Sequence, residues 1–126
     1  MLNDSEMLFK AAGDRTRLRI LKMLEPGPLC VCQMVETLSL AQSTVSKHLS
    51  ILSGVGLIDD ERQGKWTFYR LAKPRSPEAL LLLKAVGRCA CDDPGVTKDL
   101  ARVASERIRS LLGCCPPRGG ERRVAS

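Results

Sequence analysis

Most apolar positions of the chain recur every three or four residues, the spacing of one buried helix face. This pattern predicts helices over about residues 8–12, 15–25, 32–38, 42–53, 77–88 and 96–112. The fourth is the clearest, because Val45, Leu49 and Leu52 stand at i, i+4 and i+7. Residues that commonly begin helices stand at the start of two other predicted helices. Asp14 is a good N-cap residue, and Ser76-Pro77-Glu78 combines a cap, a proline at the first helical position and an acid.

A second pattern covers residues 57–71, where two segments are rich in apolar and β-forming residues. Gln63-Gly64 stands between them and predicts a hairpin turn. Ser39-Leu40-Ala41 is typical of a tight turn before the fourth helix. This order of elements predicts a mainly α fold with a small β-hairpin, the winged helix-turn-helix. In that fold the helix after the turn enters the major groove of DNA, and the hairpin contacts a flanking groove or the phosphates.

The length and the C-terminal composition set the domain organisation. A chain of 126 residues suits one compact domain, which we expect over residues 1–112. Residues 113–126 include Pro116-Pro117-Arg118-Gly119-Gly120 and a basic end, so we expect a disordered tail there.

The charge and the cysteine count indicate the setting of the protein. The net charge of +6 fits a polyanionic partner, although charge alone fits an unspecific basic surface equally well. The first six residues show no signal peptide, and the apolar run over residues 79–83 is too short to span a bilayer. We therefore expect a cytoplasmic location, where thiols stay reduced. The six cysteines are then better explained as metal ligands or redox groups than as disulfides.

Three segments resemble the ArsR/SmtB family of bacterial metal-sensing repressors. They are FKAAGDRTRLRIL at residues 9–21, STVSKHLSIL at residues 43–52, and GLI at residues 56–58 followed by RQGKWTFYRL at residues 62–71. The resemblance extends from Leu8 to about Ala72, over half of the chain. It implies a homodimer that assembles through its N- and C-terminal helices, binds operator DNA, represses a resistance operon and releases the DNA when an inducer binds.

The Cys30-Val31-Cys32 segment, just before the predicted recognition helix, indicates the inducer. It resembles the arsenite-sensing motif Glu-Leu-Cys-Val-Cys-Asp-Leu, with Pro28 and Gln33 as departures. Many arsenical repressors carry a third cysteine three residues after the second, and Val35 occupies that position here. Thiolates suit As(III) and Sb(III), and they also suit Cu(I), Zn(II) and Cd(II). The resemblance therefore implies As(III) or Sb(III) as the inducer ligand.

The spacing of Cys30 and Cys32 constrains how they share an ion. Residues two apart in a regular helix point about 200° apart, so they cannot hold one atom. We expect an extended backbone or a distorted helix start at this pair, and an effect of binding on the recognition helix. The alternative is that both cysteines are small buried apolar residues.

A third sulfur must come from elsewhere in the sequence. The other cysteines are Cys89, Cys91, Cys114 and Cys115, and the resemblance places the helices beside them at the dimer interface. They complete the first site, form a separate site as in relatives that bind arsenite through C-terminal cysteines, or are accessory thiols. His48 is the only histidine, and carboxylates at metal spacing are lacking, which argues against the zinc-sensing branch.

Polar residues gather where the fold predicts DNA contact. On the fourth helix they are Gln42, Ser43, Thr44, Ser46, Lys47 and His48, and at the hairpin tip they are Arg62, Gln63 and Lys65. Glutamine reads adenine, serine and threonine bind bases or phosphates, and basic side chains suit phosphate. The alternative is an ordinary solvated surface. The aromatic residues of the hairpin are expected to pack in the wing and core rather than to stack on bases.

The sequence thus predicts a repressor that responds to arsenite or antimonite. A second hypothesis keeps the DNA binding and changes the signal to Cd(II), Cu(I), an organoarsenical or thiol oxidation. A thiol enzyme such as an arsenate reductase, or a metal carrier, is disfavoured because no phosphate-type loop accompanies Cys30. We therefore expect no enzymatic activity.

Overall fold

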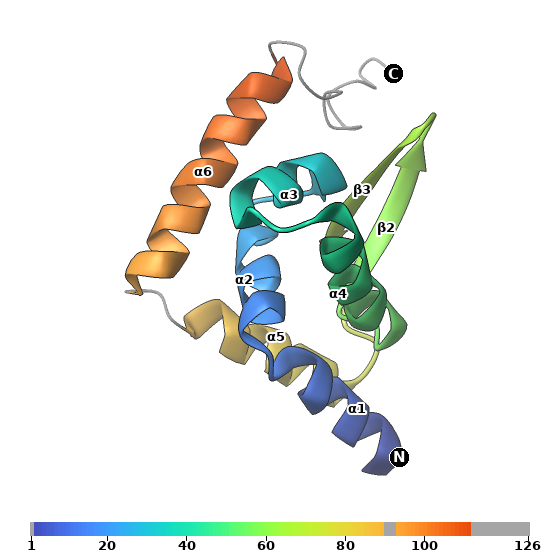
Figure 1. Ribbon diagram of the computed structural model, residues 1–126. Helices are drawn as coiled ribbons and strands as arrows, with labels where there is room; N and C mark the ends of the chain where they lie inside the picture. The colour runs from blue at the N-terminus through green and yellow to red at the C-terminus, as the bar shows by residue number, and fades with distance from the viewer. Residues whose placement is uncertain (1, 90–92, 112–126) are drawn as a thin grey trace.

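The computed structural model describes residues 2–89 and 93–111, with side chains as far as residue 105. Its elements are α1 (Leu2–Ala12), α2 (Arg15–Met23), β1 (Leu29–Cys30), α3 (Val31–Leu38), α4 (Gln42–Gly54), β2 (Ile58–Gln63), β3 (Trp66–Leu71), α5 (Pro77–Arg88) and α6 (Pro94–Leu111) (Figure 1). The three strands form one antiparallel sheet in the order β1-β3-β2. Over the described ranges, no helix has the length and apolar character needed to cross a membrane.

Helix α2 lies at the centre of the core. Ile20, Leu21 and Met23 are fully buried, and α1, α4, α5 and α6 all pack against this helix (Figure 1). A nine-residue helix is too short to be stable alone, so packing on several sides maintains it. The arrangement of the other helices therefore depends on α2.

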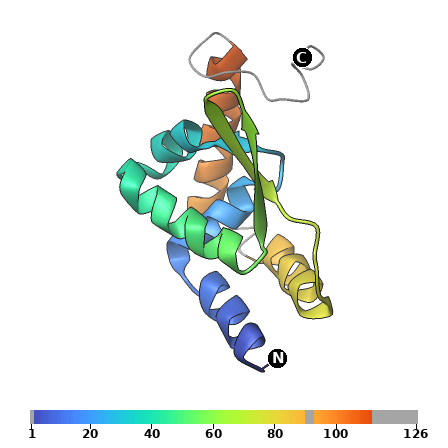
Figure 2. The same cartoon turned by 90° about the vertical axis from the view of Figure 1, so that its right-hand side faces the viewer.

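Helices α3 and α4 form the helix-turn-helix. Ser39 takes the left-handed conformation between them, with φ 57°, and its amide donates to the Val35 carbonyl. Val45, Leu49 and Leu52 are buried, as the sequence pattern predicts, and the opposite side of α4 is exposed. Figure 2 shows α4 beside the β2-β3 hairpin on the face toward the viewer, whereas α6 lies behind them. The structure therefore confirms the predicted winged helix-turn-helix.

Some element boundaries differ from those predicted. Helix α1 begins at Leu2 rather than near Leu8, because its first turns face solvent and lack a repeat of buried apolar residues. Helix α6 begins at Pro94, where Asp93 Oδ2 accepts the Val96 amide at 3.1 Å. Proline suits the first turn of a helix and so starts α6 rather than delaying it.

The hairpin turn and the first strand also correct the sequence prediction. Gln63 pairs with Trp66, so the turn is Gly64-Lys65 rather than Gln63-Gly64. Gly64 has φ 63°, which glycine tolerates at the first turn position. Strand β1 was not predicted, because two residues form a strand only through pairing with the distant β3.

Lys22 attaches α5 to α2. Its side chain is buried, and Nζ donates to the carbonyls of Val86 and Gly87, both at 3.1 Å. Nζ also lies 3.2 Å from Glu25 Oε2. A cation at the C-terminal turn of α5 satisfies carbonyls that the helix leaves open, and it interacts favourably with the helix dipole.

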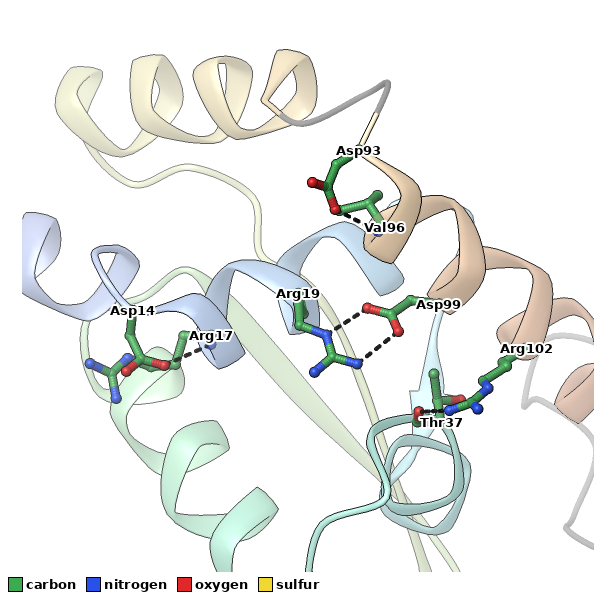
Figure 3. Close-up of polar contacts among 8 residues, drawn as sticks. All are labelled: Asp14, Arg17, Arg19, Thr37, Asp93, Val96, Asp99 and Arg102. Atoms are coloured by element: carbon green, nitrogen blue, oxygen red, sulfur yellow. Dashed lines mark hydrogen bonds and ion pairs between the residues drawn. The ribbon is translucent and has the colours of Figure 1, made fainter.

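Helix α6 is attached to α2 and α3 by two arginines. Arg19 donates to both carboxylate oxygens of Asp99, at 2.7 and 2.8 Å, and Arg102 donates to the Thr37 carbonyl at 3.0 Å (Figure 3). The bond to Asp99 raises the pKa of Arg19. The two contacts hold α6 against the end of α3 and against the central helix.

We predict that Asp99→Ala lowers the free energy of unfolding by about 1–3 kcal/mol, because it removes the partner of a charged hydrogen-bonded pair. The Asp99 side chain is 4% exposed, whereas Glu61 and Arg70 form an exposed pair at 48% and 44%. In urea denaturation, the control Glu61→Gln should therefore change the free energy of unfolding by no more than about 0.5 kcal/mol. Equal losses in the two variants would contradict the role of the Asp99 pair.

We also predict a pH-dependent contribution from Asp14, the N-cap of α2. Its Oδ2 accepts the Arg17 amide at 3.1 Å, and this bond, followed by the charge of Arg17, holds the pKa of Asp14 below its ordinary value. A lowered pKa stabilises the fold at neutral pH, and the contribution is lost as the pH falls below about 4. Thermal unfolding should show that Asp14→Asn, a cap that does not titrate, loses less stability than the wild type over that range. Parallel losses would contradict the prediction.

Candidate inducer and DNA-binding sites

The thiols of Cys30 and Cys32 lie together at the start of α3. Cys30 has φ −89° and ψ 165°, an extended backbone, and serves as the N-cap of α3, whereas Cys32 is in the first turn. The Sγ–Sγ distance is 2.8 Å. The structure thus realises the first of the two geometries that the spacing allows, an extended residue followed by a helix. Cys30 is buried and Cys32 is exposed, so the pair is open to solvent on one side.

Gln33 holds this helix start in place. Its Oε1 accepts the Cys30 amide at 2.8 Å, and the side chain is 1% exposed. The contact is the return half of a capping box, in which the third helical residue bonds back to the N-cap. The departure from the arsenite motif at Gln33 therefore has a structural role next to the thiols. Its position three residues after Cys30 is a sequence signal that could have revealed it.

Cys30 also belongs to the sheet of the wing. Leu29 pairs with Tyr69 and Cys30 with Phe68, both on β3. One residue therefore ends a strand bonded to the wing and begins the first helix of the helix-turn-helix. Any shift of the Cys30 backbone affects both of these elements.

The structure places Cys89 elsewhere. It is the exposed C-cap of α5 and lines a cavity of about 330 Å³ next to Arg15, Arg19 and Lys22. Cys89 and the Cys30/Cys32 pair thus belong to different elements, the end of α5 and the start of α3. Within residues 2–89 and 93–105, no group of three or more His, Cys, Asp or Glu side chains is placed to hold a metal ion. The cysteines Cys91, Cys114 and Cys115 lie outside the described residues.

The exposed side of α4 carries the predicted DNA-contact residues. Five of them have exposed side chains: Gln42, Ser43, Thr44, Ser46 and Lys47. The N-cap is Ala41, which has no side-chain hydrogen bond to the helix, and Ser39 does not replace it because it ends α3. First-turn amides without a side-chain cap suit an anion such as a DNA phosphate.

His48 differs from its neighbours on α4. It is half-buried, and its Nδ1 lies 3.1 Å from Arg17 Nη1 of α2. The sequence drew no attention to Arg17, because a contact between residues 31 positions apart leaves no local signal.

The wing tip carries the remaining predicted residues. Arg62 and Lys65 are exposed, and Gln63 Nε2 donates to Glu61 Oε2 at 3.3 Å. Lys65 Nζ lies 5.7 Å from the ring centre of Trp66, within the range of a cation–π contact. Trp66 belongs to the wing strand β3 and is 36% exposed, so it lies in the wing with part of its ring open to solvent. Its place in the last strand pair before the turn leaves little protein to cover it.

The helix pair, the exposed side of α4 and the adjoining hairpin define a winged helix-turn-helix DNA-binding protein. Residues 14–60 match the family model described as the bacterial regulatory protein, arsR family. That range contains the thiol pair, the whole helix-turn-helix and the start of the wing.

Known proteins are similar over a larger part of the chain. The arsenical resistance operon repressor of Escherichia coli K12 is 38% identical over 97 residues, 75% of this chain and 83% of that protein. HlyU from Vibrio cholerae matches with a TM-score of 0.61 and 31% identity, covering 71% of this chain and 94% of that one. The homodimeric winged helix-turn-helix domain of Mb0332 from Mycobacterium bovis, a possible ArsR-family regulator, shares the fold, with a TM-score of 0.56, 23% identity and coverages of 87% and 85%.

The chain belongs to the ArsR family of transcriptional regulators, which confirms the resemblance inferred from the sequence. It is a DNA-binding regulator rather than an enzyme.

We predict that Ala41→Ser raises the free energy of unfolding by about 1 kcal/mol, because the hydroxyl supplies the side-chain cap that α4 lacks. Urea denaturation measures the change. Ala101→Ser is a matched control in the exposed interior of α6, where serine should be slightly destabilising. No gain at position 41 would show that another group already satisfies the first turn of α4.

Proposed function

We propose that the protein is a homodimeric repressor that binds operator DNA and releases it when trivalent arsenic or antimony binds Cys30 and Cys32. The observation that carries this proposal is the 2.8 Å separation of the two sulfurs at the residue that α3 shares with the wing sheet. A DNA partner and reduced thiols both suit a location in the cytoplasm.

The DNA-binding part of the proposal rests on shape and charge. Helix α4 presents a row of exposed polar side chains, the wing presents Arg62, Gln63 and Lys65 beside it, and the chain has a net charge of +6. In this geometry Gln42 and the hydroxyl residues near it read bases or bind phosphates. The basic side chains neutralise phosphates and give an affinity that falls with salt.

The homodimer is supported by exposed apolar side chains on α1 and α5. On α1 they are Leu2, Met7 and Phe9, and on α5 they are Leu80 and Leu81. Large apolar side chains gathered on two neighbouring helices favour contact with a second protein surface. The domain of Mb0332, which shares the fold, is homodimeric. A two-fold dimer would present two recognition helices to two half-sites.

The inducer part of the proposal rests on thiol chemistry. Two adjacent sulfurs, one of them exposed, provide a soft chelate that suits As(III) or Sb(III). A third sulfur would come from Cys89, Cys91, Cys114 or Cys115 of either subunit. Coordination at Cys30 and Cys32 would alter the N-cap geometry of α3, and with it the Gln33 contact and the pairing of β1 with β3. Both DNA-contacting elements would then change position.

The same geometry favours one alternative signal, thiol oxidation. Two sulfurs this close can be joined by a disulfide after a modest shift in their backbone. Cd(II), Cu(I) and organoarsenicals are further thiophilic inducers of the same repressor. These signals differ in what they require of the remaining cysteines, so variants can separate them.

We predict that arsenite lowers the affinity of the wild-type protein for its operator at least about tenfold, a coupling within the usual range for allosteric regulators. The operator would be a duplex selected from a random pool by the wild-type protein, and fluorescence anisotropy would measure binding. Cys30→Ser and Cys32→Ser should each retain DNA binding and lose the response, because either change removes one of the two adjacent thiolates.

Cys89→Ser is the matched single-thiol variant outside the pair, and it tests Cys89 as a third ligand. Double serine variants of Cys89/Cys91 and of Cys114/Cys115 test the third ligand. Parallel titrations with phenylarsine oxide, Cd(II) and diamide separate the alternative inducers. Release of DNA from Cys30→Ser and Cys32→Ser by arsenite would contradict the proposed site. DNA binding that no inducer affects would contradict the sensor function.

A further inference from the structure

The Arg17 guanidinium connects three helices. Its Nε donates to the Ala11 carbonyl at 2.6 Å and its Nη2 to the Lys10 carbonyl at 3.4 Å, both in the last turn of α1. Its Nη1 lies 3.1 Å from Nδ1 of His48 on α4. Two carbonyls thus fix the orientation of the group that faces the histidine.

Donor and acceptor chemistry determines the state of His48 in this contact. A guanidinium carries five N–H donors and no acceptor, and it remains protonated in proteins. Nδ1 must therefore accept the bond, so it carries a lone pair. In a neutral imidazole the proton then resides on Nε2, at the other side of the ring. Arg17 favours the one neutral form of His48 whose outer nitrogen is a donor.

The position of His48 on α4 puts this N–H donor near the predicted DNA-contact residues. The residue follows the exposed Lys47 and precedes the buried Leu49, and it is half-buried itself. The ring is therefore partly exposed beside the predicted DNA-contact residues of α4, with its Nδ1 toward Arg17. Neutral N–H groups of side chains commonly bind phosphate oxygens and fix the register of a protein on the duplex.

We infer that Arg17 is a positioning residue for DNA binding, which holds His48 in the Nε2-protonated form so that the ring donates to a DNA phosphate. The inference rests on the proposed contact of α4 with operator DNA, and it adds a residue of α2 that does not itself touch the DNA. The bonds to the α1 carbonyls fix the position of the guanidinium. The guanidinium in turn fixes the orientation of the His48 ring.

The first test is spectroscopic. His48 is the only histidine, so the two-bond ¹H–¹⁵N spectrum of the full chain contains one imidazole. At a pH where the ring is neutral, the wild type should show the Nε2-protonated form alone. Arg17→Met should give a mixture of both neutral forms. Arg15→Met, which removes the same charge from an exposed position of α2, should give the wild-type spectrum. A protonated Nδ1 in the wild type would overturn the inference.

The second test measures operator affinity and thermal stability without any inducer. Arg17→Met should weaken binding about three- to tenfold more than Arg15→Met, the value of a lost hydrogen bond. In a His48→Leu background, Arg17→Met and Arg15→Met should have equal effects on affinity. Equal effects of the two arginine variants in the wild-type background would overturn the inference.

Two substitutions of His48 separate positioning from a merely structural bond. His48→Asn keeps an acceptor near the place of Nδ1 and lacks the outer donor, so it should retain stability and lose affinity. His48→Gln supplies an N–H near the place of Nε2 and should bind more tightly than His48→Asn. Wild-type affinity of His48→Asn would show that the contact only ties α4 to α2, which overturns the inference.

These outcomes are distinct from failure of the proposed function. A wild-type protein that selects no duplex would overturn the repressor proposal itself. DNA binding that arsenite does not alter would overturn the inducer and leave the comparison of Arg17 and His48 variants unchanged.

Discussion

The burial of α2 is the constraint on which the other helices depend. Its side chains Ile20, Leu21 and Met23 are buried in the core. Three of its four basic side chains make polar contacts with neighbouring helices. Arg17 contacts α1 and α4, Arg19 contacts α6, and Lys22 contacts α5. Residues two apart on a helix point about 200° apart, so Arg17 and Arg19 face opposite sides. One short helix thus sets the positions of α1, α5 and α6 and of the recognition helix α4.

Helix α3 is held at both ends by different parts of the molecule. At its start, Cys30 pairs with Phe68 of the wing and Gln33 closes the cap. At its end, Arg102 of α6 bonds the Thr37 carbonyl. These contacts couple the start of this eight-residue helix to the wing and its end to α6. Helix α6 carries the chain toward the C-terminal cysteines from this same contact.

Local chemistry in the sequence predicted the helices, their caps and the winged helix-turn-helix, because each signal lies within a few residues. Asp14 and Ser76 cap the helices that they were expected to cap. The spacing of Cys30 and Cys32 gave the condition for shared binding, but only the pairing with β3 shows why Cys30 is extended. The contacts of Arg17 and Arg102 join residues far apart in the chain, so no local pattern could reveal them.

The close approach of the two sulfurs has a thermodynamic consequence. A ligand shifts a conformational equilibrium only by the difference between its affinities for the two states. Moving a population from 1% to 99% takes a difference of about 10⁴-fold. The two sulfurs already lie 2.8 Å apart in this conformation, so the pair favours a released state only to the extent that coordination there is stronger. In the proposed mechanism, that gain comes from the changed geometry at the start of α3 together with any further sulfur that joins the pair.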